Sequence, residues 1–336
     1  MDIKINETEY KGQKALTIES DVLKIQFLPE NGAKISSLFY KPLEKECFVQ
    51  REGDQFRKQP YDGVYLKADG AGFDDMFPNI DEYYYDKYPW KGTRLPDHGE
   101  VWFLPWDVEV QKEKLYFKVN GIRLPYILEK WVSMPHKNTL RIEYKATNPT
   151  PFDMDFSWAG HVMLNTEEGA QIYLPDDLKN AYCTYAKSGF LANYGDEFSW
   201  PEAVAKDGSV FHADRIRSRS TDDVLKYYFK NQLKEGWGAM RCPSDNSIVG
   251  ISFPPSQVPY MALLHNEGGS HDIWGIDDYC FYFEPCTSAF DRPDIARLHG
   301  MDSVLKARSS YSWYLNISVT EGENVRKVTE DGIIMI

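Results

Sequence analysis

The sequence lacks a run of apolar residues near the roughly 18–20 needed to cross a bilayer. Its first residues also lack the basic and apolar regions of a signal peptide. Cys-x-x-Cys motifs are missing as well, and the five cysteines are odd in number and widely spaced. This usage predicts reduced thiols, and neither a disulfide framework nor a zinc site. We therefore expect a cytoplasmic protein.

Positive charge is scarce. The 336 residues include 38 Lys and Arg against 51 Asp and Glu, which gives a net charge of −13. This balance argues against a nucleic-acid partner, which would need a basic face, and against docking on anionic membranes. Nucleotide-binding glycine loops and a Gly-x-Ser-x-Gly elbow are also missing. We expect no cofactor and no metal, and the oligomeric state stays open.

Aromatic residues, in contrast, are abundant. The chain contains 9 Trp, 22 Tyr and 18 Phe, which together make up 15% of its residues. Aromatic side chains favour strands, where they pack well on a pleated surface. They also form flat apolar walls for ligands, sugar rings included. Most of them are expected to belong to the core.

Alternation of apolar and polar residues predicts strands throughout the chain. Residues 140–147 alternate strictly, with Leu140 and Ile142 on one face and Arg141 on the other, and residues 16–19, 106–110 and 313–319 do the same. Turn signals separate these segments, and only short stretches such as 291–299 favour a helix. The sequence therefore predicts an all-β protein, a sandwich or barrel, in a single domain over residues 1–336.

Two segments break the alternation. Residues 68–106 are dense in Gly, Pro, Asp and Tyr, and residues 265–299 hold three of the seven histidines. Long irregular segments in compact domains are usually functional or disordered, and the first segment is too aromatic to be disordered. We expect the site to lie at these two segments. Their tryptophans Trp90, Trp102 and Trp274 are candidates for stacking on a ligand.

Three ionisable residues stand out as candidates. His98 precedes Gly99, which suits a loop that faces a cleft, although a turn role is commoner for such a histidine. His161 lies in an apolar strand, where a core role is commoner. Glu284 follows three aromatic residues, and a carboxylate is costly to bury there unless its charge is held or used. Desolvation would raise its pKa, which suits a general base.

Four further carboxylates cluster at the first segment. Asp74, Asp75, Asp81 and Glu82 are close enough in sequence to suggest a cation site. They do not follow the Asp-x-Asp-x-Asp-Gly loop pattern of calcium sites, however. We interpret them as solvated surface charge.

The order of four motifs resembles the aldose 1-epimerase, or galactose mutarotase-like, superfamily. These motifs are Phe77-Pro78-Asn79, His98-Gly99, the segment from His161 to Asn165, and Glu284-Pro285, and the resemblance covers roughly residues 10–320. It implies a large antiparallel β-sandwich, called a supersandwich, with a carbohydrate ligand in a cleft. It also implies a general acid at His161, a general base at Glu284 and a substrate-binding role for His98.

The chain departs from the family pattern at three of these motifs. The family's His-Pro-Tyr-Phe stretch reads here as His161-Val162-Met163-Leu164. The family's His-Gly-Phe-Ala-Arg is replaced by a stretch from His98 to Trp102 without arginine. Ile80-Asp81-Glu82 follows the Phe-Pro-Asn motif where the family often has arginine. The family's additional substrate-binding aspartate has no motif counterpart. These changes keep the acid–base pair and leave the identity of the sugar and its anomer open.

The resemblance thus predicts a mutarotase that interconverts the α and β anomers of a sugar. A base takes the proton of the anomeric hydroxyl and an acid protonates the ring oxygen, so the ring opens and recloses. A carboxylate and an imidazole on opposite sides of the sugar would suffice. The expected substrate-binding residues share a place in or beside the motif segments: His98, Asn79, Arg94, Trp90, Trp102 and Trp274.

Three alternatives remain open. A sugar-phosphate 1-epimerase would need cations for the phosphate, and only Lys91 and Arg94 lie close to the first motifs. A non-catalytic sugar-binding protein could share the fold, because fold does not determine function. A lyase acting on uronic acids would need a basic subsite, which the charge balance does not favour.

Overall fold

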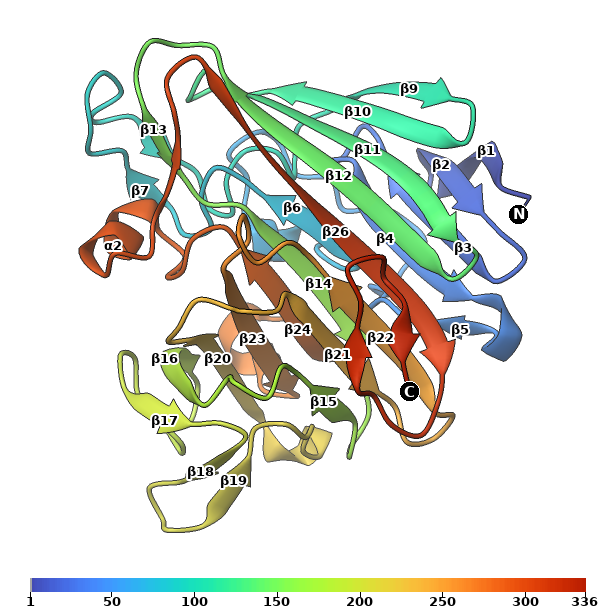
Figure 1. Cartoon of the computed structure of the whole chain (residues 1–336), viewed down its shortest axis with the longest axis vertical. Helices are drawn as coiled ribbons and strands as arrows, with labels where there is room; N and C mark the ends of the chain where they lie inside the picture. Colours follow the sequence, from blue (N-terminus) through green and yellow to red (C-terminus); the bar gives the residue numbers. More distant parts are fainter. Residues whose placement is uncertain (1) are drawn as a thin grey trace.

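The computed structural model describes residues 2–336, which form two large antiparallel sheets (Figure 1). The larger sheet has 12 strands in the order β1-β2-β3-β4-β6-β14-β24-β23-β20-β16-β17, with β5 paired to β4. Its strands are β1 (Lys4–Tyr10), β2 (Gln13–Glu19), β3 (Leu23–Leu28), β4 (Lys34–Tyr40), β5 (Lys45–Glu46), β6 (Phe73–Met76), β14 (Ala159–Asn165), β16 (Asn180–Ala186), β17 (Glu197–Ser199), β20 (Asp223–Phe229), β23 (Tyr260–Glu267) and β24 (Tyr279–Cys286).

The smaller sheet has eight strands and lies across the larger one, with its long strands β11, β12 and β26 in front in Figure 1. In spatial order it contains β15 (Gln171–Tyr173), β21 (Trp237–Arg241), β22 (Ser247–Ser252), β26 (Ser309–Glu321), β12 (Thr139–Asn148), β11 (Ile127–His136), β10 (Lys114–Asn120) and β9 (Asp107–Gln111).

Short strand pairs and helical turns complete the fold. The pairs are β7 (Tyr83–Tyr84) with β8 (Arg94–Leu95), β13 (Met154–Phe156) with β25 (Ser303–Leu305), β18 (Glu202–Val204) with β19 (Val210–His212), and β27 (Lys327–Val328) with β28 (Ile334–Met335). The two α-helices are α1 (Ser270–Trp274) and α2 (Pro293–Leu298), and 3-10 turns occupy Lys41–Leu43, Tyr65–Lys67 and Arg219–Thr221. The predicted all-β sandwich is confirmed, and α2 lies in the segment predicted to be helical.

Residues 2–336 contain no helix of the length and apolar character needed to cross a membrane.

The core lies between the two sheets, as the alternation of β12 illustrates. Leu140, Ile142 and Ala146 are fully buried, whereas the residues between them are half-buried. On the opposite sheet, Phe283 of β24 approaches the small sheet so closely that a Cβ on Gly238 of β21 would lie 2.8 Å from its ring. The face of the large sheet that carries Phe283 therefore packs against the small sheet, and the alternate face points away from it.

One predicted half-buried strand is exposed on both faces. The predicted segment 106–110 lies in β9 except for Trp106, but Val108 and Val110 are 40% and 52% exposed. The reason is its position, because β9 is the edge strand of the small sheet and pairs only with β10. Alternation predicted the strand correctly, but its burial depends on a covering layer that does not extend to this edge.

The prediction of solvated surface charge is wrong for Asp74 and Asp75, which are 2% and 1% exposed. Asp75 faces the small sheet, where the fully buried ammonium of Lys130 on β11 lies 2.8 Å from its carboxylate. The indole of Trp158 donates a hydrogen bond to the other carboxylate oxygen, at 2.9 Å. Asp74 points the opposite way and pairs with Lys34 at 2.7 Å. Each carboxylate can stay ionised although it is buried, because a lysine ammonium compensates its negative charge.

Candidate active site

The sheet register gathers polar side chains in one row on the outer face of the large sheet. His161 of β14 pairs with Asp74 of β6. On the other side, Val162 pairs with Phe283, which brings His161 beside Glu284 of β24. Because side chains of adjacent strands at the same level share a face, these groups lie next to each other.

His161 and Glu284 face each other within this row. Their Nε2 and Oε2 atoms are 3.5 Å apart, and the two residues are 5% and 1% exposed. The His161 Nε2 atom has no hydrogen-bond partner among residues 2–336. Burial and the neighbouring positive charges hold the pKa of His161 well below its usual value, and burial raises the pKa of Glu284. Burial therefore disfavours the charged form of both side chains.

His98 completes a group of three ionisable side chains. Its ring lies 5.4 Å from that of His161 and stacks on Tyr65, with the centroids 4.1 Å apart and the planes 14° apart. Tyr65 in turn donates a hydrogen bond to Asp74 at 3.0 Å. The structure thus brings together His98, His161 and Glu284.

The loop that carries His98 is tightly constrained. A Cβ on Gly99 would lie 2.3 Å from the carbonyl oxygen of Phe77, and φ of Gly99 is +72°, so only glycine fits there. Asn79 is fully buried, and its amide donates to the carbonyls of Asp81 and Pro96, at 2.9 and 2.8 Å. Asn79 therefore holds the loop in place through its amide nitrogen, while its Oδ1 atom has no hydrogen-bond partner among residues 2–336.

Lys226 of β20 joins the site from two strands away. Its ammonium lies 2.9 Å from Oε2 of Glu284 and 2.8 Å from Oδ1 of Asp291, which also accepts a hydrogen bond from Tyr228 at 2.7 Å. Burial opposes the charge on Lys226, but Asp291 and Glu284 outweigh it and raise the pKa of this lysine. Sequence reasoning missed Lys226, although a lysine that alternates with Val224 and Tyr228 in a buried strand was a usable signal.

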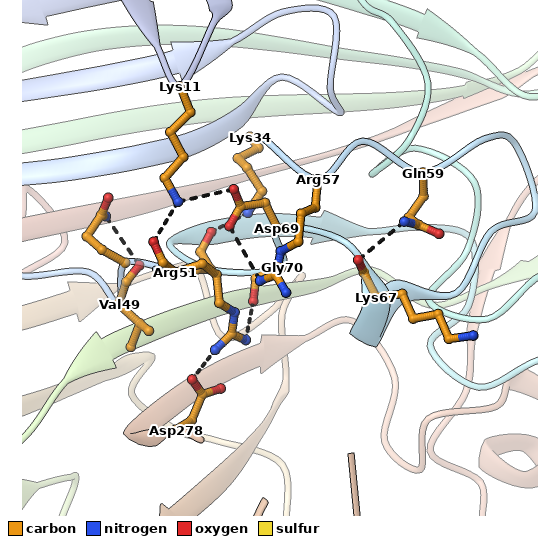
Figure 2. Close-up of polar contacts among 12 residues, drawn as sticks. Lys11, Lys34, Val49, Arg51, Arg57, Gln59, Lys67, Asp69, Gly70 and Asp278 are labelled. Carbon is orange, nitrogen blue, oxygen red and sulfur yellow. Dashed lines mark hydrogen bonds and ion pairs between the residues drawn. The ribbon is translucent and has the colours of Figure 1, made fainter. Parts of the chain in front are cut away.

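A buried ion network joins the two irregular segments (Figure 2). The Arg51 guanidinium pairs with Asp278, which precedes β24, and donates to the carbonyl oxygen of Gly70 at 2.9 Å. Lys11 contacts the carboxylate of Asp69 at 3.3 Å. The turn that carries Tyr65 is thereby anchored to the strand that carries Glu284.

The remaining predicted residues lie at different distances from this centre. Trp102 is buried and packs edge-on against Tyr65, so it supports the His98 stack from behind. Trp274 of α1 packs against a cluster on the outer face that includes Leu264. Trp90 packs against Tyr85 and Phe152. These contacts place Trp102 and Trp274 beside the site. Trp90 instead packs among aromatic residues that do not contact the three ionisable groups.

Arg94 is occupied by two carboxylates. Its guanidinium contacts Asp62 and Glu82, each at 2.6 Å. A guanidinium held at both ends has few donors left for a ligand.

A small pocket opens beside Asp291. It has a volume of about 50 Å³ and is lined by Asp81, Thr184, Tyr194, Phe290, Asp291, Arg292 and Ile295. A larger open hollow of about 920 Å³ lies between the first strands and the β11–β12 turn, with lining residues that include Lys41 and His136. The chemistry favours the small pocket, because its lining residue Asp291 lies 2.8 Å from the ammonium of Lys226, which in turn contacts Glu284.

His265 lies on the opposite face of the large sheet from His161. It is 1% exposed, and its Nε2 atom is 3.2 Å from the hydroxyl of Tyr227. Burial, with the charge of Arg217, lowers the pKa of His265 to about 3. It is therefore a neutral core histidine.

This burial predicts a specific acid sensitivity. Below its ordinary pKa of about 6.5, His265 binds a proton in the unfolded chain but not in the folded one. Stability should therefore fall as the pH drops from about 6.5 toward 3, by about 1.4 kcal/mol per pH unit. Urea unfolding at pH 7 and pH 5 gives the free energy of unfolding at each pH. Between these two values, His265→Gln should lose about 2 kcal/mol less of this free energy than the wild type. Equal losses would refute this, and His271→Gln, at an exposed position, serves as the control.

No family model matches the chain, and no curated protein matches it. Several solved structures do. A galactose mutarotase-like protein from Clostridium acetobutylicum has a TM-score of 0.67 at 14% identity, covering 96% of this chain and 99% of that one. Another from Lactobacillus casei has a TM-score of 0.65 at 16% identity, covering 91% and 100%. A galactose mutarotase related enzyme from Lactobacillus acidophilus has a TM-score of 0.62 at 15% identity, covering 91% and 97%.

These likenesses extend over nearly the whole chain and identify its fold. The protein has the galactose mutarotase-like fold, as the order of its four motifs predicted.

Proposed function

We propose that this protein is a carbohydrate mutarotase that interconverts the α and β anomers of a sugar by acid–base ring opening. One observation carries the proposal. A buried imidazole whose Nε2 atom lacks a hydrogen-bond partner faces a buried carboxylate, and these are His161 and Glu284. Unpartnered buried polar atoms are costly, and they are commonly retained where they serve a reaction. The names of the structures with the same fold support the same class of chemistry.

In the proposed reaction, Glu284 removes the proton from the anomeric hydroxyl while His161 delivers a proton to the ring oxygen. The C1–O5 bond breaks, an aldehyde forms at C1, and rotation about C1–C2 presents its other face. The ring then recloses with the proton transfers reversed. His98, held against Tyr65, is positioned to bind and polarise the sugar. Each proton transfer contributes about 10²–10⁴-fold.

The acid and the base lie side by side, at 3.5 Å, and not on opposite sides of a sugar-sized gap as we expected from the sequence. This arrangement suits the reaction because the anomeric and ring oxygens are both bonded to C1. A sugar that presents its C1 edge to the pair can therefore reach both groups from one direction.

Binding requires movement at the mouth of the site. At about 50 Å³, the pocket is far smaller than the roughly 300–1,000 Å³ typical of small-molecule sites. Tyr194, one of its lining residues, is 69% exposed. We propose that Tyr194 and Phe290 shift when a sugar enters, and that Trp274 and Leu264 then contact its apolar face.

The substrate in this proposal is an uncharged sugar. The cations nearest the site are already held by carboxylates: Lys226 by Glu284 and Asp291, and Arg292 by Asp294 at 2.6 Å. The positive charge of both residues is thus already compensated, and a phosphate would have to compete with these carboxylates for it. The sugar-phosphate alternative is therefore the weaker one.

The proposed acid can be tested by His161→Asn. We expect the rate of anomer exchange, measured by NMR on a sugar that the wild type accelerates, to fall by at least about 10²-fold. Asparagine fills similar space but cannot donate a proton at neutral pH. His136→Asn, on the small sheet, is the control and should keep the wild-type rate. A folded His161→Asn protein with full activity would show that the acid is another group.

A further inference from the structure

Lys226 reaches Glu284 across an intervening strand. It lies on β20, Glu284 lies on β24, and β23 runs between them. On β23, Ala262 pairs with both Glu284 and Tyr228. Lys226 itself pairs with Leu264, two residues along β23, so its side chain must run diagonally over Ala262 to reach Glu284, and the single methyl group of alanine leaves room for it.

The ammonium of Lys226 is held on two sides. It contacts Oε2 of Glu284 at 2.9 Å and Oδ1 of Asp291 at 2.8 Å, while Tyr228 donates to the same oxygen of Asp291 at 2.7 Å. An ammonium has three donors, so one remains after these two contacts. We call Lys226, Asp291 and Tyr228 the lysine clamp.

A buried general base must meet two opposing requirements. Glu284 must be ionised to accept a proton, yet at 1% exposure it has almost no water to stabilise the charge. The groups that face it are His161 from β14, His98 from its loop, Asp291 and Lys226. Burial and the charge of Asp291 oppose ionisation, whereas the ammonium of Lys226, 2.9 Å from the carboxylate, favours it.

We propose that Lys226 is a positioning residue of the reaction inferred above, which keeps Glu284 ionised and fixed in direction, and that Asp291 and Tyr228 hold the lysine for this purpose. The proposal rests on the proposed function. It assigns Lys226 no contact with the reacting atoms. Because Lys226 acts through Glu284, its removal should change the pH at which the base works and not the kind of chemistry.

The test is a direct titration of Glu284. Protein labelled with ¹³C at the glutamate carboxyl carbon is titrated by NMR, and Glu284→Gln identifies the resonance. We expect Lys226→Met to raise the midpoint by about 1–3 pH units, as loss of an adjacent opposite charge does. Lys226→Arg should return the midpoint to within about one pH unit of the wild type, because arginine keeps the charge. Lys230→Met removes an exposed lysine just after β20 and should leave the midpoint unchanged.

A folded Lys226→Met protein with the wild-type midpoint would overturn the proposal. Should Lys226→Met not fold, Lys226→Gln keeps a hydrogen-bond donor without the charge, and the same comparison applies. On a sugar that the wild type accelerates, the acid limb of kcat/KM should move upward with the midpoint. The titration needs no substrate, so it still decides the role of Lys226 if mutarotation itself is not observed.

Discussion

Replacing Glu284 by glutamine should reduce the acceleration of mutarotation by at least about 10²-fold. Glutamine has nearly the shape of glutamate, but its amide cannot take a proton from the anomeric hydroxyl. Its neighbours should stay in place, because Asp291 still holds Lys226 at 2.8 Å and Tyr65 still holds Asp74 at 3.0 Å. The measurement is the initial rate of anomer exchange by polarimetry, at a pH where the wild type is most active.

The matched control is Glu143→Gln, on β12 of the small sheet. This side chain is 44% exposed and should not affect the rate. Thermal unfolding of both variants checks that a lost rate is not lost structure. A folded Glu284→Gln protein with the wild-type rate would remove Glu284 from the reaction.

Among substitutions of charged side chains, Lys130→Met should cause the largest loss in the free energy of unfolding. Lys130 is fully buried between the sheets, contacts Asp75 at 2.8 Å and donates to the carbonyl oxygen of Ala33 at 2.9 Å. Methionine fills the space but leaves the carboxylate of Asp75 buried without its cation. Breaking one side of such a pair costs about 3–5 kcal/mol. Urea unfolding at pH 7 measures this free energy.

Two further variants separate charge from packing. Lys145→Met removes the lysine of a partly exposed pair with Glu129, at 3.7 Å, and should change stability by less than about 1 kcal/mol. Combining Lys130→Met with Asp75→Asn removes both charges and should recover part of the loss. If Lys130→Met cost no more than Lys145→Met, the buried pair would not stabilise the contact between the sheets.

Local patterning predicted the strands well because the pleat has a period of two residues. The alternation from Leu140 to Ala146 corresponds directly to the buried face of β12, a central strand. The same argument failed for the burial of Val108, because its strand lies at an edge. Position in a sheet depends on pairing between distant segments, and one segment alone does not contain that information.

The candidate site was only partly predictable for a similar reason. His98, His161 and Glu284 carry motifs, and the structure brings them together. The role of Asp74 was hidden because its partner Lys34 lies 40 residues earlier, and no local spacing connects the two. The alternation around Lys226 was a usable signal for a buried lysine, but its partner was not predictable, since Glu284 belongs to a strand two positions away in the sheet.

The most direct test of the account is polarimetry on freshly dissolved, pure α-anomers with and without the purified protein. The panel contains glucose, galactose, fucose, xylose, arabinose and glucose 6-phosphate. The account predicts faster mutarotation of at least one neutral sugar, with the acceleration lost in Glu284→Gln. If a sugar binds but no neutral sugar mutarotates faster than spontaneously, the protein is not a mutarotase, and a sugar-binding role on this fold replaces the proposed reaction.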